Sequence, residues 1–279
     1  MINRKESEKK RNRDIVTKLA LTLLAWIITV TPTVAAPLPC LIEPQEVVEL
    51  GSPVIGVIES ILVERGDRVE KNQLVVQLKD RVETRAMELA RSRAKDQAEL
   101  QSAIAASEHA NREQRRVGSM LNNKLVSRQV VDKAITEASL AEHKLEQARA
   151  NLKNSKLEHK LAMARLNQRA LRSPISGVVT DRYLSPGQRV QEQPVLKIVR
   201  IDPLRVEVIV PAEHYNRFEP GQTATVTPQL AGFGPEQAEI KIVDRMIDPG
   251  SNTFRVTLEL PNPDHKIPAG ARCKADLGV

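Results

Sequence analysis

The chain has 279 residues, of which 2% are aromatic and 28% are charged. That length allows two or more domains of roughly 100 to 150 residues each, and so few aromatic side chains argue against an enzyme with one large buried pocket. The net charge is +7, but residues 1–18 carry +4 of it. The remaining charges have both signs interspersed along predicted helices without stacking aromatics, which argues against a nucleic-acid-binding protein.

The first 36 residues have the order of a secretory signal peptide. The basic stretch is followed by the apolar run Leu19–Val30, by Pro32 and by the small residues Val34-Ala35-Ala36. The run is about a dozen residues long, short of the roughly 20 that span a bilayer. We therefore expect cleavage near Ala36. A retained N-terminal anchor is the alternative, because Pro37 would hinder cleavage at that bond.

Export would place the chain in an oxidising compartment. Its only two cysteines, Cys40 and Cys273, lie near the mature start and near the C-terminus. In such a compartment they could pair as a disulfide, with two unpaired thiols as the alternative.

The most informative feature is an internal repeat. Residues 52–78 align with residues 173–199 at a constant offset of 121, without a gap. Seven positions are identical, namely Ser52, Pro53, Gly56, Val57, Gly66, Arg68 and Val69 in the first copy and Ser173, Pro174, Gly177, Val178, Gly187, Arg189 and Val190 in the second.

Each copy predicts short strands broken by a glycine-containing turn, since glycine supplies the positive φ that such turns often need. We assign the repeated glycines Gly56, Gly66, Gly177 and Gly187 to the turns. One copy has too few strands to bury a face alone. The repeat therefore predicts one small β-sandwich, split in sequence and rejoined in space.

Between the copies lie about 90 residues, Asp80–Arg172, with no proline and a single glycine, which is a helical composition. Apolar residues at 3-4 spacing form one seam from Val82 to Leu121 and another from Val131 to Arg169. The seams predict an antiparallel coiled-coil hairpin that turns near Asn122, with Ser127 as N-cap of the second helix. Two residues that face each other across the hairpin should have residue numbers that sum to about 248. Arms of roughly 40 residues would reach about 60 Å, which favours a partner at the tip.

Beyond Asp202-Pro203 the sequence predicts five short strands separated by turns that contain proline or glycine. Strands at this spacing indicate a small β-barrel. The predicted fold is therefore an elongated, multidomain α+β protein with a split β-sandwich, an inserted antiparallel α-helical hairpin and a C-terminal β-barrel.

This order of parts resembles the HlyD-like membrane fusion proteins, the periplasmic adaptors. The two SPxxGV segments are similar to the halves of that family's lipoyl-like domain, and residues 252–256 and 268–270 weakly resemble its barrel signatures. The resemblance covers roughly residues 45–279. It divides the chain into a signal peptide or anchor (1–36), an extended segment (37–49), a first lipoyl-like half (50–79), the hairpin (80–171), a second lipoyl-like half (172–201) and the barrel (202–279).

The resemblance implies a periplasmic adaptor, associated with the inner membrane, that couples an RND or ABC transporter to a TolC-type outer-membrane channel. Several copies would form a ring, and the hairpin tip would dock on the channel. The family's tip pattern of Arg, Leu and Ser falls on Arg116, Met120 and Ser127, with Met in place of Leu. The simpler alternatives are a solvated charge, a turn-packing side chain and a helix cap. We expect no membrane-proximal domain beyond the barrel, which leaves the contact with the transporter open.

Two other protein classes stay open. A lipoyl or biotinyl carrier needs a modifiable lysine at an exposed turn between its halves, and Lys79 lies near that place, although a helix-forming run follows it. A coiled-coil envelope scaffold without transport is the other. No catalytic, cofactor or metal site is predicted, because no histidine has ligand spacing to another or to a cysteine among His109, His143, His159, His214 and His265.

Overall fold

The computed structural model describes residues 37–278, so the predicted signal segment 1–36 lies outside the described residues. The elements are, in chain order, β1 (Leu38–Leu50), β2 (Gly56–Ile61), β3 (Arg68–Val69), β4 (Leu74–Leu78), α2 (Arg81–Lys95), α3 (Ala98–Asn122), α4 (Arg128–Asn167), β5 (Ala170–Arg172), β6 (Gly177–Arg182), β7 (Arg189–Val190), β8 (Leu196–Pro211), the 3-10 helix η1 (Ala212–Arg217), β9 (Thr223–Pro228), β10 (Glu236–Val243), β11 (Thr253–Leu260) and β12 (Arg272–Asp276).

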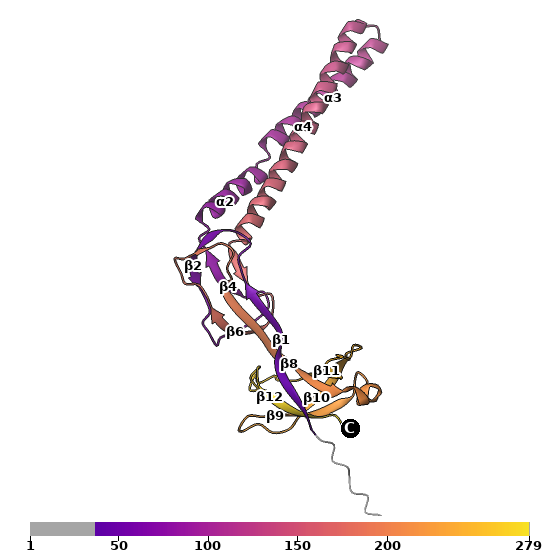
Figure 1. The fold of residues 1–279 in the computed structure, drawn as a ribbon. Coiled ribbons are helices and arrows are strands. Elements are labelled where there is room, and N and C mark those ends of the chain that lie inside the picture. Colours follow the sequence, from indigo (N-terminus) through magenta and orange to yellow (C-terminus); the bar gives the residue numbers. More distant parts are fainter. Residues whose placement is uncertain (1–36, 279) are drawn as a thin grey trace, which may run out of the picture.

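The molecule is elongated. Figure 1 shows the helices α2, α3 and α4 at one end, strands β9 to β12 at the other, and strands β2 to β7 between them. The predicted α+β class is confirmed. Two separate clusters of buried apolar side chains lie in the strand region, one among β8 to β12 and one among the repeat strands.

Six strands close into a barrel in the order β1-β12-β9-β10-β11-β8, with β8 pairing back to β1. Buried and exposed side chains alternate along β8: Val206, Val208 and Val210 are buried, while Ile209 is exposed. Valine suits a pleated surface, and the period of two sends every second side chain into the barrel. The barrel core therefore follows directly from the sequence pattern.

Two strands are longer than the sequence analysis expected. Residues 37–49 were assigned to an extended segment, but Leu38–Leu50 is strand β1, which pairs with β12 and then with β8. Asp202-Pro203, the predicted boundary between two strands, lies inside β8. The ladder between β1 and β8 shifts register between Pro44 and Glu46, opposite this proline. A proline has no N–H to donate, and a strand accommodates it at such an irregularity.

The two repeat copies interlock around an approximate twofold axis. Strand β2 of the first copy pairs with β7 of the second, and β3 of the first pairs with β6 of the second. The N–H of Gly66 donates to the carbonyl of Val179 at 2.8 Å, and the N–H of Gly187 donates to the carbonyl of Ile58 at 2.9 Å, which is the same bond at the offset of 121. Gly66 and Gly187 have φ of 97° and 88°, the left-handed region that favours glycine.

The assignment of Gly56 and Gly177 to turns is wrong. They begin strands β2 and β6, and neither has a positive φ. A Cβ at Gly177 would overlap the backbone carbonyl of Val199, and a Cβ at Gly56 would press on Arg169 and Leu78. Glycine is needed at Gly177, because the backbone of another strand approaches it closely, whereas the side-chain ends near Gly56 can shift aside.

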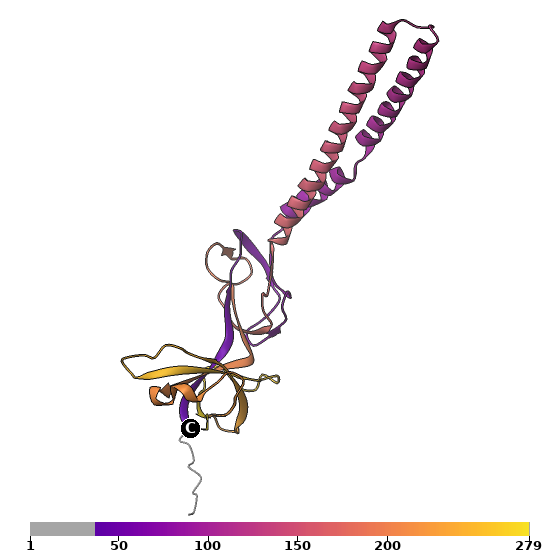
Figure 2. The same ribbon diagram turned by 90° about the vertical axis from the view of Figure 1, so that its right-hand side faces the viewer.

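Helices α3 and α4 run antiparallel and pack along their length (Figure 2). The Ser107 hydroxyl donates to Glu142 Oε2 at 2.9 Å, and Asn151 Nδ2 donates to Glu99 Oε1 at 3.0 Å. These residue numbers sum to 249 and 250, close to the expected 248. Four small or apolar seam positions of α4 are buried: Ala134, Ala138, Leu145 and Ala148.

The first arm is not one helix. It ends as α2 at Lys95 and resumes as α3 at Ala98. The break changes the phase of the seam, so that Val82 and Leu89, expected inside the hairpin, are 77% and 55% exposed. The less exposed line of α2 runs one residue later, through Glu83, Met87, Ala90 and Ala94. A period count that assumes one continuous helix cannot detect this shift.

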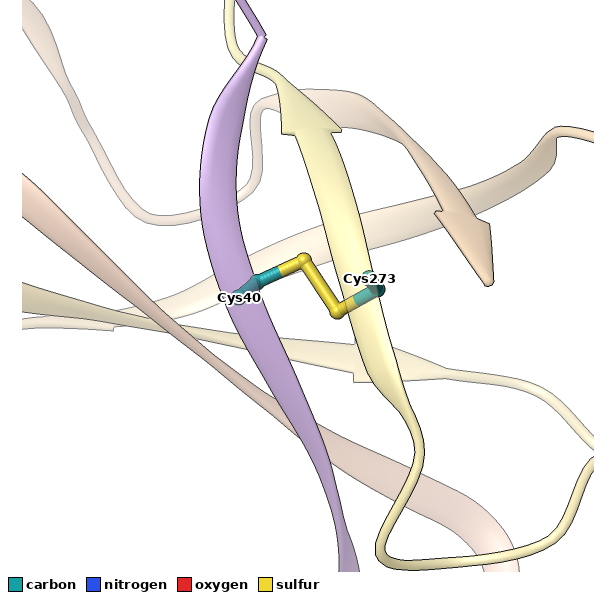
Figure 3. The surroundings of a disulfide bond; sticks show 2 residues. All are labelled: Cys40 and Cys273. Atoms are coloured by element: carbon teal, nitrogen blue, oxygen red, sulfur yellow. A yellow bond between two sulfur atoms is a disulfide. The ribbon is translucent and has the colours of Figure 1, made fainter. Parts of the chain in front are cut away.

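Figure 3 shows the disulfide that joins Cys40 on β1 to Cys273 on β12. These residues face each other in the β1–β12 ladder, with Cα atoms 4.8 Å apart. The bond links the first barrel strand to the last. Among the described residues, no helix combines the length and the apolar character needed to cross a bilayer.

Candidate docking site at the hairpin tip

The hairpin tip is built by a helix ending that reverses the chain sharply. Lys124 has a φ of 56°, its N–H donates to the Leu121 carbonyl at 2.8 Å, and the N–H of Leu125 donates to the Met120 carbonyl at 3.0 Å. This pair of bonds is a Schellman motif, which satisfies carbonyls left open at the end of α3. Glycine or asparagine usually holds the left-handed position, so the lysine there carries a backbone cost.

Arg116 lies one turn before Met120 on α3, and its side chain is 66% exposed. Its Nε donates to Glu113 Oε2 at 2.9 Å, and a second guanidinium nitrogen pairs with Glu113 Oε1. The hydrogen bond from Arg116 holds the pKa of the Glu113 carboxyl below its usual range, and the same bond raises the pKa of Arg116. A partner carboxylate would therefore have to compete with Glu113 for the guanidinium.

Met120 is half-buried near the end of α3, while Ser127 is exposed just before α4. Ser127 occupies the predicted N-cap position of α4, but its hydroxyl makes no capping hydrogen bond. A capping hydroxyl would accept a hydrogen bond from the N–H of Val130, but this N–H donates instead to the Ser127 carbonyl at 3.2 Å. The Ser127 hydroxyl is thus available for a partner.

Sequence reasoning missed two apolar side chains at the tip. Leu125 is 67% exposed and Val130 is 45% exposed. The signal for Leu125 was available, because a leucine between turn-forming asparagines and a helix start has no seam position to fill. With the half-buried Met120, they give the tip three apolar side chains that solvent reaches. Such side chains suit end-on protein contact.

The remaining sequence candidates do not form a second site. Lys79 is exposed where β4 ends and α2 follows almost at once, so it does not occupy a tight turn that joins the two repeat copies. Within residues 37–278 no three His, Cys, Asp or Glu side chains gather as a metal ion would require.

Comparison with known proteins agrees with the fold. Residues 46–200 match the family described as CzcB-like, barrel-sandwich hybrid domain. The chain is 27% identical over 234 residues to the macrolide export protein MacA of Escherichia coli O157:H7, a match that covers 78% of this chain and 60% of MacA. It is 25% identical over 265 residues to the multidrug resistance protein MdtE of Escherichia coli K12, covering 88% of this chain and 66% of MdtE. The chain therefore spans less than two thirds of either relative.

Two solved structures share the fold. MacA from Actinobacillus actinomycetemcomitans superposes with a TM-score of 0.72 at 20% identity, covering 86% of this chain and 76% of that one. The membrane fusion protein Spr0693 from Streptococcus pneumoniae R6 gives 0.60 at 14% identity, covering 87% and 98%. The matched segment contains both repeat copies and the helices between them. The chain belongs to the CzcB-like barrel-sandwich hybrid family, and its predicted relationship to the membrane fusion proteins is confirmed.

Proposed function

We propose that this protein is a periplasmic adaptor of an efflux or secretion system. It would couple an inner-membrane transporter, of the RND or ABC type, to a TolC-type outer-membrane channel. The names of two relatives, a macrolide export protein and a multidrug resistance protein, support a role in export. Association with the inner membrane would come through the N-terminal segment, as a cleaved signal or as an anchor.

In this proposal the parts of the chain act as separate domains. Residues 50–79 and 172–201 form one lipoyl-like unit, residues 80–171 form the hairpin and residues 202–279 form the barrel. Several copies stand side by side as a ring, so that the tips together present one surface to the channel. The observation that carries the proposal is the hairpin tip, which lies far from the barrel and exposes Arg116, Leu125 and Ser127 (Figure 1).

Reversal of the Arg116 charge tests the docking role. Arg116→Asp should weaken docking by roughly tenfold or more, because a carboxylate would face the acidic or carbonyl groups that the guanidinium is proposed to meet. The measurement is drug resistance or secretion in cells whose only copy is the variant. Arg112→Asp is the matched control, since Arg112 is also exposed and lies one turn further from the tip.

Undiminished export with Arg116→Asp at normal protein levels would count against docking through this residue. A second measurement identifies the partner directly. A photoreactive amino acid at position 120 should capture an outer-membrane channel, whereas the same group at the exposed position 139 in mid-hairpin should not. Capture of the channel from both positions, or from neither, would contradict end-on docking at the tip.

A further inference from the structure

Basic and acidic residues are distributed unevenly along the hairpin, although both signs were predicted to be interspersed along the helices. The half near the tip, residues 98–122 and 128–149, has seven bases and seven acids. The half near the barrel-sandwich strands, residues 81–95 and 150–167, has nine bases and three acids, a net charge of +6. A solvated helix surface without a ligand has no need of such a concentration of one sign.

The two halves also differ in how their charges are paired. Near the tip, four ion pairs join bases to acids within the same helix, for example Arg112 with Glu108 and Lys133 with Glu137. In the lower half two of the three acids are engaged, Glu88 by Arg85 and Glu83 by Arg169. Among the described residues, eight exposed cations of the lower half have no ion-pair partner: Arg81, Arg91, Arg93, Lys95, Lys153, Lys156, Lys160 and Arg165.

Five of these cations, Arg91, Lys95, Lys153, Lys156 and Lys160, lie on one side of the hairpin. Arg91 and Lys95 each follow, by one residue, the α2 positions that face α4, Ala90 and Ala94. Lys156 and Lys160 each follow, by one residue, the partly buried α4 positions Ser155 and His159. In an antiparallel helix pair, the residue directly after each facing position lies on the same side of the pair in both helices. Lys153, three residues before Lys156, lies on that side as well. We call this set of five the basic face.

The line between the two rows of cations consists mostly of small side chains. Ala90 and Ala94 come from α2 and Ser155 from α4, with Leu152 and His159 as the two larger groups. Small residues let a third helix approach two packed helices closely. The cations on either side repeat at three and four residues, which is also the spacing of side chains along one face of an approaching helix.

We propose that the basic face binds an acidic amphipathic helix of a partner protein. The helix lies along α2 and α4, sets small or apolar side chains over the alanines, and places Asp or Glu at three- and four-residue spacing against the two rows of cations. A second copy of this chain is disfavoured as the occupant, since its own lower half carries the same +6 charge. Single-stranded nucleic acid is disfavoured because the face has no aromatic side chain on which bases stack.

The proposal is independent of docking at the tip. It concerns the side of the hairpin at the opposite end of the helices, and each site has its own variants. Arg116→Asp should leave binding at the basic face unchanged. Loss of binding at the basic face would leave crosslinking from position 120 unchanged. The failure of one proposal is therefore distinguishable from the failure of the other.

The test uses purified protein and a synthetic helical peptide of about three heptads, with alternating Leu and Ala on one face and Glu on both flanks. Binding is followed by fluorescence anisotropy at low and at physiological ionic strength. We expect binding that weakens with salt, because exposed charges are screened. The combined variant Lys153→Gln, Lys156→Gln and Lys160→Gln should lower the affinity by roughly tenfold, since each exposed pair contributes only a modest amount.

The matched control removes three exposed cations of the neutral upper half, by Arg112→Gln, Lys133→Gln and Lys144→Gln, and should change the affinity less than about twofold. A peptide with Gln in place of every Glu should not bind. The proposal is overturned if the acidic peptide fails to bind, if the control variant loses as much affinity, or if the Gln peptide binds equally well. It is also overturned if polyphosphate or phosphatidylglycerol vesicles bind this face while the peptide does not.

Discussion

At the residue scale, the tip depends on one side chain in an uncommon conformation. Lys124 has a left-handed backbone, which costs roughly 1–2 kcal/mol for a residue with a Cβ. Lys124→Gly should raise the free energy of unfolding of the hairpin by about 0.5–1 kcal/mol, as measured by thermal melting of the helical circular dichroism. Asn123→Gly is the control, because Asn123 has a φ of −89° and gains nothing from glycine there. Equal stabilisation by both changes would contradict the role of the Lys124 conformation.

Other single residues show how far the sequence predicts local roles. Gly66 and Gly187 were predicted from turn chemistry alone, since a positive φ is a property of the local chain. The need for glycine at Gly177 depends on the Val199 carbonyl of another strand, a contact that no local pattern contains. The exposed Ser127 hydroxyl could not be foreseen either, because a serine before a helix ordinarily caps it.

At the scale of elements, the hairpin depends on small residues at the seam. Ala138 is 5% exposed, so a larger side chain would push α3 and α4 apart. Ala138→Leu should cost about 1–3 kcal/mol by overpacking and lower the melting temperature of the helices. The neighbouring exposed position supplies the control: Ser139→Leu should shift the melting temperature little. A similar loss in both variants would mean that the seam is not closely packed.

The elements were predicted to different degrees for a physical reason. The seam of α4 was found because one unbroken helix keeps its period over 40 residues. The seam of α2 was misplaced because Asp96-Gln97 interrupts the first arm without a proline or a glycine to signal it. There Asp96 Oδ1 accepts a hydrogen bond from the Ala98 N–H at 3.0 Å, a local bond that helps to restart the helix. Strand β1 was not predicted because its pairing partners are far away in the sequence: even Leu196, opposite Leu50, lies 146 residues further along the chain (196 − 50).

At the scale of the whole molecule, the disulfide closes the barrel and the shared strands hold the barrel to the rest. The bond between Cys40 and Cys273 restricts the unfolded chain over a separation of 233 residues. Replacement of both cysteines by serine should cost roughly 2–4 kcal/mol, seen as an earlier unfolding transition of the barrel strands. Titration of denatured, unreduced protein should find no free thiol, and two thiols per chain would show that the cysteines do not pair.

Strands β1 and β8 each run from the barrel into the repeat strands, and they pair with each other in both places. The order of parts was predictable from the repeat and its insertion, because each part has its own periodicity. The continuity of β8 through both cores was not predictable, because a proline such as Pro203 ordinarily marks the end of a strand. Two strands that pass through both cores resist twisting of one core against the other.

The disulfide also makes most of the polypeptide into a covalent ring, because everything from Cys40 to Cys273 lies between its two ends. The hairpin is part of that ring, because its residues lie between Cys40 and Cys273 in the sequence. A protease that nicks the exposed turn around Lys124 would leave both pieces tethered, and they would separate on a denaturing gel only after reduction. The protein would thus survive a single cut at its most accessible point as one molecule.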